Sequence, residues 1–180
     1  MRYEMKKKWF ALSESLIVRD VNGQDVCTIQ AAILSFNTHL TVQDMMGREL
    51  ASIEGKVFSF PTTYEFFQGG TRKAVIKKDF WSFFAPKFTI EMSDGSMLEV
   101  QGDFLNHEYM FTRAGTPVAQ VSMAWFALTD TYGVDVSDYV DPVLVLACAA
   151  IIDVTCHGRQ GSIGVNAVGA IIDDIGDALT

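Results

Sequence analysis

One stretch near the C-terminal end of the chain has no polar side. Positions 143–152 are all apolar, and the stretch is bounded by Asp141 and Asp153. Asp141 suits the capping position of a helix and Pro142 its first helical position, where the missing N–H costs nothing. The pattern predicts a helix over 142–157, roughly 24 Å long at about 1.5 Å per residue. Because this helix is apolar all round, it must be enclosed by protein.

The same stretch is too short to cross a membrane. It has ten apolar residues, whereas a helix needs about 20 to span a hydrocarbon core. The basic N-terminus is followed by Ser13 and Glu14 rather than by an uninterrupted apolar run, so no signal peptide is predicted. We therefore expect a soluble chain without a transmembrane segment, which encloses the apolar helix in its own fold.

Regularly spaced glycines divide the rest of the chain. Each lies between two short segments rich in β-branched and aromatic residues, as is typical of β-hairpins. The glycines are Gly23, Gly47, Gly70, Gly95 and Gly115, and the flanking pairs are Leu16–Asp20 with Val26–Ile29, Leu40–Gln43 with Leu50–Ile53, Tyr64–Phe67 with Ala74–Ile76, Phe88–Met92 with Met97–Val100, and Tyr109–Thr112 with Val118–Val121. Asn22-Gly23 and Asp94-Gly95 favour type I′ turns, whose central residues need positive φ. With Lys8–Leu12 and Thr131–Val136 added, the chain supplies about twelve strands.

Alternation within these segments indicates strands with one buried face. Phe88, Ile90 and Met92 share a face, and so do Leu98 and Val100. A flat sheet cannot enclose the apolar helix, but a closed barrel can, and closure also removes exposed sheet edges. A propeller is a poor alternative, because its blades need four strands each. The predicted fold class is mostly β: a closed antiparallel barrel of about twelve strands enclosing a central hydrophobic α-helix.

Several sequence runs are recognisable. The main run extends from Trp125 to Val136 and is followed by Asp141-Pro142 and the apolar helix. Supporting runs are Met5–Phe10, Pro61–Glu65, Lys87–Ile90 and Gly102–Phe104. Together, over Met1 to His157, they resemble the LURP-one-related family, and most closely its YxjI-like branch in the tubby C-terminal-like superfamily.

The resemblance implies a twelve-stranded barrel around a central hydrophobic helix, and it implies no established biochemical activity. Better-known relatives, the tubby proteins and the phospholipid scramblases, are associated with phosphoinositides and membranes. No local motif here matches the phosphoinositide ligands of tubby proteins, so none of those residues is carried over.

The length of 180 residues fits one domain. We expect the barrel and its helix over 1–158, with Gly158 ending the helix, and a C-terminal tail over 159–180. Within the tail, Asn166–Leu179 predicts a short amphipathic helix that caps the barrel or packs on its side. A helix for partner binding or self-association is the alternative.

The net charge of −8 is unevenly distributed. Residues 1–123 contain 13 Lys and Arg against 14 Asp and Glu, and residues 124–180 contain one Arg against eight acids, so −1 and −7 sum to −8. This balance disfavours a nucleic-acid binder, which needs a positive surface for phosphates. Basic residues nevertheless gather in two clusters, which are Lys6, Lys7 and Lys8, and Arg72, Lys73, Lys77 and Lys78.

The second basic cluster precedes the aromatic segment Phe80–Phe84. Lysines beside an aromatic loop can face an anionic membrane, with the charges on headgroups and the rings at the interface. The alternative is structural: the lysines protect strands from edge pairing, and Trp81, Phe83 and Phe84 belong to the core. Strand alternation over Lys77–Phe84 would also divide the charges between two faces.

No arrangement typical of an enzyme occurs in the sequence. His39, His107 and His157 lack the spacing of metal-binding motifs, and the glycine-containing segment 158–164 lacks the Lys-Ser/Thr of a phosphate-binding loop. Asp153 is expected near the barrel mouth in a hydrogen bond, since an unpaired buried carboxylate is costly. We predict no catalytic residue, no metal ligand and no cofactor. A deep polar pocket gathering Asp153, His157 and a basic side chain would reopen the question of an enzyme.

These observations favour a non-catalytic binding or scaffold barrel that recognises anionic phospholipid through the two basic clusters. The alternatives are a barrel for a small apolar ligand, which the central helix opposes by filling the lumen, and a protein-interaction module. The three cysteines do not make a disulfide framework, so we expect a cytoplasmic location, peripheral to a membrane if lipid is the ligand. We also expect a monomer.

Overall fold

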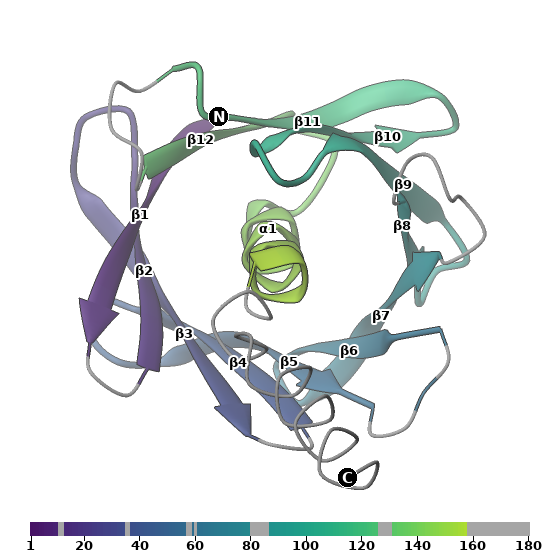
Figure 1. Ribbon diagram of the computed structural model, residues 1–180, viewed down its shortest axis with the longest axis horizontal. Coiled ribbons are helices and arrows are strands. Elements are labelled where there is room, and N and C mark those ends of the chain that lie inside the picture. The colour runs from purple at the N-terminus through teal and green to yellow at the C-terminus, as the bar shows by residue number, and fades with distance from the viewer. Residues whose placement is uncertain are drawn as a thin grey trace, which may run out of the picture.

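Twelve antiparallel strands form a closed barrel around one helix in the computed structural model of the chain (Figure 1). The structure describes residues 1–10, 13–34, 37–56, 59, 61–79, 87–125 and 131–157. Its strands are β1 (Arg2–Phe10), β2 (Ser13–Arg19), β3 (Asp25–Leu34), β4 (Asn37–Asp44), β5 (Glu49–Gly55), β6 (Thr63–Gln68), β7 (Thr71–Asp79), β8 (Lys87–Met92), β9 (Met97–Asp103), β10 (Glu108–Arg113), β11 (Thr116–Ser122) and β12 (Thr131–Val136), and its helix is α1 (Pro142–His157). Each strand pairs with its neighbours in sequence, and pairing of β1 with β12 closes the barrel. This architecture confirms the predicted fold class.

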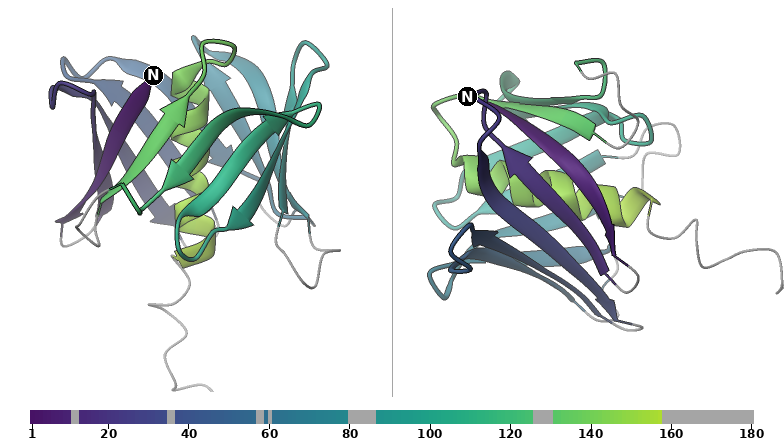
Figure 2. Two further views of the ribbon diagram at one scale, coloured as in Figure 1. Left: turned by 90° about the horizontal axis from the view of Figure 1, so that it is seen from above. Right: turned by 90° about the vertical axis from the view of Figure 1, so that its left-hand side faces the viewer.

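The helix α1 runs along the lumen of the barrel, and its bounds are the predicted ones (Figure 2). Asp141 begins it, because its Oδ1 accepts the backbone N–H of Val143 at 2.9 Å. From Leu144 to Ile152 no residue is more than 3% exposed. The wall that buries them is the alternating inner face of the strands, on which Phe88 and Ile90 are fully buried.

The predicted terminator Gly158 and the predicted tail lie outside the described residues. The same holds for the amphipathic helix over Asn166–Leu179 and for the aromatic segment Phe80–Phe84. The division of the chain at residue 158 therefore stays a prediction.

Two local predictions were wrong. The first strand begins at Arg2 rather than at Lys8, because β1 extends along β12 from the pair of Arg2 and Asp135 onward. The turns at Gly23 and Gly95 are not type I′, since the preceding residues do not have positive φ. A three-residue turn forms instead at each.

The turn at Gly23 shows how this geometry is stabilised. The Gly23 N–H donates to the Asp20 carbonyl at 3.0 Å, and the Asp20 carboxylate accepts the N–H groups of Asn22 and Gln24 at 2.9 Å each. Gly23 has a φ of 76°, which glycine adopts without steric cost.

Among the described residues, α1 is the sole helix, and it does not combine the length and the apolar character that a membrane-spanning helix needs.

Candidate functional site

The two ends of the barrel differ in what they place beside α1. Because neighbouring strands are antiparallel, β1 and β7 run in the same direction and both finish where α1 finishes. We call this the His157 end of the barrel, and the opposite end, where α1 begins, the Pro142 end (Figure 2).

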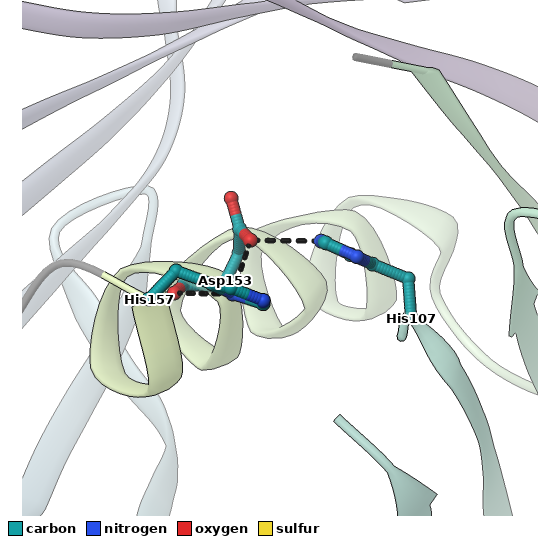
Figure 3. Close-up of side chains that lie close together, drawn as sticks. All are labelled: His107, Asp153 and His157. Atoms are coloured by element: carbon teal, nitrogen blue, oxygen red, sulfur yellow. Dashed lines mark hydrogen bonds and ion pairs between the residues drawn. The ribbon is translucent and has the colours of Figure 1, made fainter. Parts of the chain in front are cut away.

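At the His157 end, Asp153 of α1 is 4% exposed and contacts three basic side chains. Lys7 Nζ lies 2.8 Å from Oδ2 and 3.1 Å from Oδ1 of Asp153. His107 Nε2 and His157 Nδ1 each lie 2.8 Å from Oδ1, so this oxygen is shared by both rings (Figure 3). We call Lys7, His107, Asp153 and His157 the Asp153 cluster. The prediction that Asp153 is hydrogen-bonded is confirmed.

Three separate elements supply the partners of Asp153. On β1 the buried Met5 faces the lumen, and strand alternation places Lys7 on the same inner face. On α1 His157 follows Asp153 by four residues, so the two side chains lie on one face a turn apart. His107 lies in the connection between β9 and β10, where its backbone has a positive φ of 52°.

Gly102 allows the connection that carries His107 to lie close to the wall. Its φ is +142°, and a Cβ at this position would lie 2.6 Å from the Cα of Tyr109 on the adjacent strand. A larger residue would therefore push β9 away from β10 and displace His107.

The His107 ring is held between two other rings. It stacks on Tyr132 with centroids 4.5 Å apart, and on His157 with centroids 4.8 Å apart and an interplanar angle of 6°. His107 Nδ1 is buried and has no hydrogen-bond partner among the described residues. By contrast, His157 Nε2 lies 3.1 Å from the carbonyl oxygen of Leu105, which can only accept.

The surroundings favour the ionised form of Asp153. Burial raises its pKa, but the hydrogen bonds from His107 and His157 and the charge of Lys7 outweigh burial and hold that pKa well below its usual range. The hydrogen bond to Asp153 raises the pKa of His157, although burial opposes the shift. The cluster thus consists of the carboxylate of Asp153, the ammonium group of Lys7 and the ring of His157, whose protonated form the carboxylate favours.

The seven basic residues predicted to bind lipid do not form one patch. Arg72 and Lys73 lie at the Pro142 end, near the start of β7. The other five lie at the His157 end and are Lys6, Lys7, Lys8, Lys77 and Lys78. The side chain of Lys8 is outside the described part of the structure.

Two of these residues are neutralised by acids on adjacent strands. Arg72 Nη1 donates to Glu65 Oε1 at 2.6 Å. Lys77 Nζ donates to both carboxylate oxygens of Glu91, at 2.7 and 2.8 Å. Both pairs lie at the barrel surface, where such pairs contribute little to stability.

The side chain of Lys78 lies on the opposite face of β7 from that of Lys77. It shares the inner face of β7 with the buried Ile76, and its Nζ lies 5.9 Å from the centre of the Phe88 ring. Its charge also acts on Cys156 of α1, whose pKa burial raises and Lys78 lowers. The lysines are therefore divided between two faces, as strand alternation predicts.

The structure adds His107 to Asp153 and His157, a neighbour that the sequence did not indicate. One ligand atom from each of His107, Asp153 and His157 lies within 4.8 Å of the others. His107 precedes Asp153 by 46 residues, and no motif spacing connects them. The Asp153–His157 spacing of four residues on a predicted helix was the available signal. Asp153, His157 and a basic side chain, Lys7, do lie together as a cluster of paired charges. This is the side-chain part of the condition stated above for an enzyme, which also requires a deep polar pocket.

Comparison with known proteins gives three findings. A family model described as LURP-one-related matches residues 1–153. The curated Uncharacterized protein YxjI of Bacillus subtilis (strain 168) is 27% identical over 156 residues, which cover 87% of this chain and 94% of that protein. An X-ray structure of a protein from Arabidopsis thaliana aligns with a TM-score of 0.61 and 13% identity over 86% of this chain and 91% of that one. At this identity the structural likeness shows the fold alone.

Proposed function

The chain belongs to the LURP-one-related family, and from this premise we propose that it is a non-catalytic binding or scaffold barrel whose ligand is an anionic phospholipid headgroup. The proposed binding surface is the His157 end, with Lys6, Lys8 and Lys78 as its cations. The proposal includes a monomeric protein in the cytoplasm, peripheral to the membrane. The three cysteines are free, which is typical of a reducing compartment.

The state of the nucleophilic side chains supports a non-catalytic role. Burial raises the pKa of Cys27 to about 11 and also raises the pKa values of Cys148 and Cys156. A protonated thiol is a poor nucleophile. Asp153 has three basic partners inside the barrel, so its charge already serves to hold α1.

The observation that carries the lipid proposal is that two lysine-bearing strands, on opposite sides of the barrel, finish at the same end (Figure 1). β1 and β7 finish at the same end of the barrel, and among the described residues Lys6 and Lys78 have no carboxylate partner. A lysine near an anionic membrane surface contributes about 1 kcal/mol to binding. Arg72 and Lys73, at the opposite end, cannot reach the same surface.

Co-sedimentation with vesicles tests this proposal. The full chain is mixed with phosphatidylcholine vesicles that contain phosphatidylglycerol or a phosphoinositide, and with pure phosphatidylcholine vesicles as the reference. Lys6→Gln combined with Lys78→Gln removes two cations from the His157 end. At about 1 kcal/mol each, the double variant should bind roughly thirtyfold more weakly.

Arg72→Gln combined with Lys73→Gln is the matched control, because it removes two cations from the Pro142 end. It should pellet like the unchanged protein. Equal pelleting of all three proteins with anionic vesicles would show that these lysines are not the binding surface. Failure of the unchanged protein to prefer anionic vesicles would remove lipid as the ligand and favour a protein partner.

A further inference from the structure

We propose that His107, Asp153 and His157 form a binding site for one divalent transition-metal ion of the zinc type. The ligands are His107 Nε2, His157 Nδ1 and Asp153 Oδ1, and such atoms of the three residues lie within 4.8 Å of one another (Figure 3). This site is independent of the proposed lipid binding.

The donor set selects the class of ion. Imidazole nitrogens suit zinc, cobalt and nickel, whereas magnesium and calcium prefer oxygen ligands throughout. With two nitrogens and one carboxylate oxygen, the site has the three protein ligands common to open zinc sites, and a fourth position is left for a solvent molecule or a small ligand.

The present hydrogen bonds already bring the ligands together. Asp153 Oδ1 is 2.8 Å from both His107 Nε2 and His157 Nδ1, and an ion about 2.0–2.2 Å from each atom would replace these two contacts. The contact of His157 Nε2 with the Leu105 carbonyl at 3.1 Å keeps a proton on Nε2. Once its other proton leaves, His157 therefore presents Nδ1 as the ligand, as metal-binding histidines with a carbonyl partner do.

Ring orientation decides which residue must move. The two imidazole rings are inclined by only 6°, and an ion cannot lie in the planes of two separated parallel rings. The side chain of His107 is 9% exposed and its ring is packed against Tyr132, whereas that of His157 is 26% exposed. The ring of His157, in the last turn of α1, therefore turns to complete the site, and the turn must keep the contact of Nε2 with the Leu105 carbonyl for Nδ1 to be the ligand.

Lys7 opposes the ion, because it is bound to the same carboxylate and its hydrogen bond reaches the proposed ligand atom, Asp153 Oδ1. Its Nζ is nearer to Oδ2 of Asp153, at 2.8 Å, than to Oδ1, at 3.1 Å. The ammonium charge repels a second cation held on the same carboxylate. Removal of this charge should tighten metal binding although it removes an ion pair of the folded protein.

Calorimetric titration with zinc chloride tests the site in the full chain, without a polyhistidine tag and after treatment with a chelator. One ion per chain should bind, and cobalt chloride should give the intense visible bands of a four-coordinate ion. His107→Gln and His157→Gln should each weaken binding by more than the roughly 10–100-fold that loss of an outer partner costs. His39→Gln is the matched control, because His39 lies on β4 and contacts Thr41 instead.

Lys7→Met should have the opposite effect from the histidine variants, because loss of the ammonium charge should make zinc binding roughly tenfold tighter. Circular dichroism of each metal-free variant establishes that it is folded, and His157→Gln, at a partly exposed position, serves if His107→Gln does not fold. No saturable binding by the unchanged protein would overturn the site. So would equal weakening by His39→Gln and His157→Gln, or weaker binding after Lys7→Met.

Discussion

The two parts of α1 are built on different principles. From Leu144 to Ile152 the helix is apolar on every side, and any well-packed apolar wall can bury it. From Asp153 to His157 it carries charge, and each charged group has a partner at a defined distance. Apolar burial is non-directional, whereas a buried carboxylate needs donors in particular positions. One helix therefore depends on apolar burial along most of its length and on paired charges in its last turn.

A charge in the apolar part should have the largest effect. Ala150→Asp places an unpaired carboxylate in a lumen where Ala150 is 1% exposed, and we expect loss of soluble folded protein. Soluble yield and thermal melting by circular dichroism measure the outcome. Ala114→Asp, on the exposed turn between β10 and β11, is the control and should change stability by less than about 0.5 kcal/mol. A soluble Ala150→Asp protein with near-normal melting would refute the enclosed helix.

Loss of charge from the polar part should have an intermediate effect. Asp153→Leu leaves Lys7 and the two rings without their shared partner, and it should cost roughly 3–5 kcal/mol of unfolding free energy. For a chain of this size the melting temperature should fall by roughly 6–20 °C. Chemical denaturation in the presence of a chelator measures the loss independently of metal.

The double variant Lys7→Met, Asp153→Leu tests whether charge is the cause. Because it leaves no unpaired Lys7, its loss of stability should be smaller than the sum of the two single losses. Strict additivity would mean that the ion pair contributes nothing and that Asp153→Leu acts through packing.

Thiol labelling compares the apolar and the polar part of α1 without any substitution. Cys148 lies in the apolar part and is fully buried, whereas Cys156 lies in the polar part and is half-buried. At pH 8 a thiol reagent should modify Cys156 at least about tenfold faster than Cys148 or Cys27. Mass spectrometry identifies the site, and all three should react in denaturant. Labelling of Cys148 in the native protein at the rate of Cys156 would contradict the division of the helix.

Sequence patterns predicted the fold because they are local. The run over 143–152 and its flanking Asp141 and Pro142 predicted the bounds of α1, and alternation such as Phe88 with Ile90 predicted the inner wall. The prediction of type I′ turns was wrong, since Asp20 accepts three N–H groups through its side chain and backbone, and these bonds select the turn at Gly23.

The candidate site was only partly predictable. Asp153 was expected to be hydrogen-bonded, but nothing in the sequence identified His107 as its partner, and Lys7 was assigned to a basic surface instead of the lumen. Which face of β1 bears Lys7 depends on its register with β12, in which Met5 pairs with Tyr132. A shift of one residue would have turned Lys7 outward.

The sequence by itself determined that an apolar helix needs enclosure and that hairpins must supply the enclosure. Only the tertiary structure decided which charged side chains meet at the end of that helix. The physical reason is the range of each interaction. Burial of apolar area sums over many residues and leaves a periodic pattern along the chain, whereas a 2.8 Å contact between Lys7 and Asp153 depends on the closure of the whole barrel.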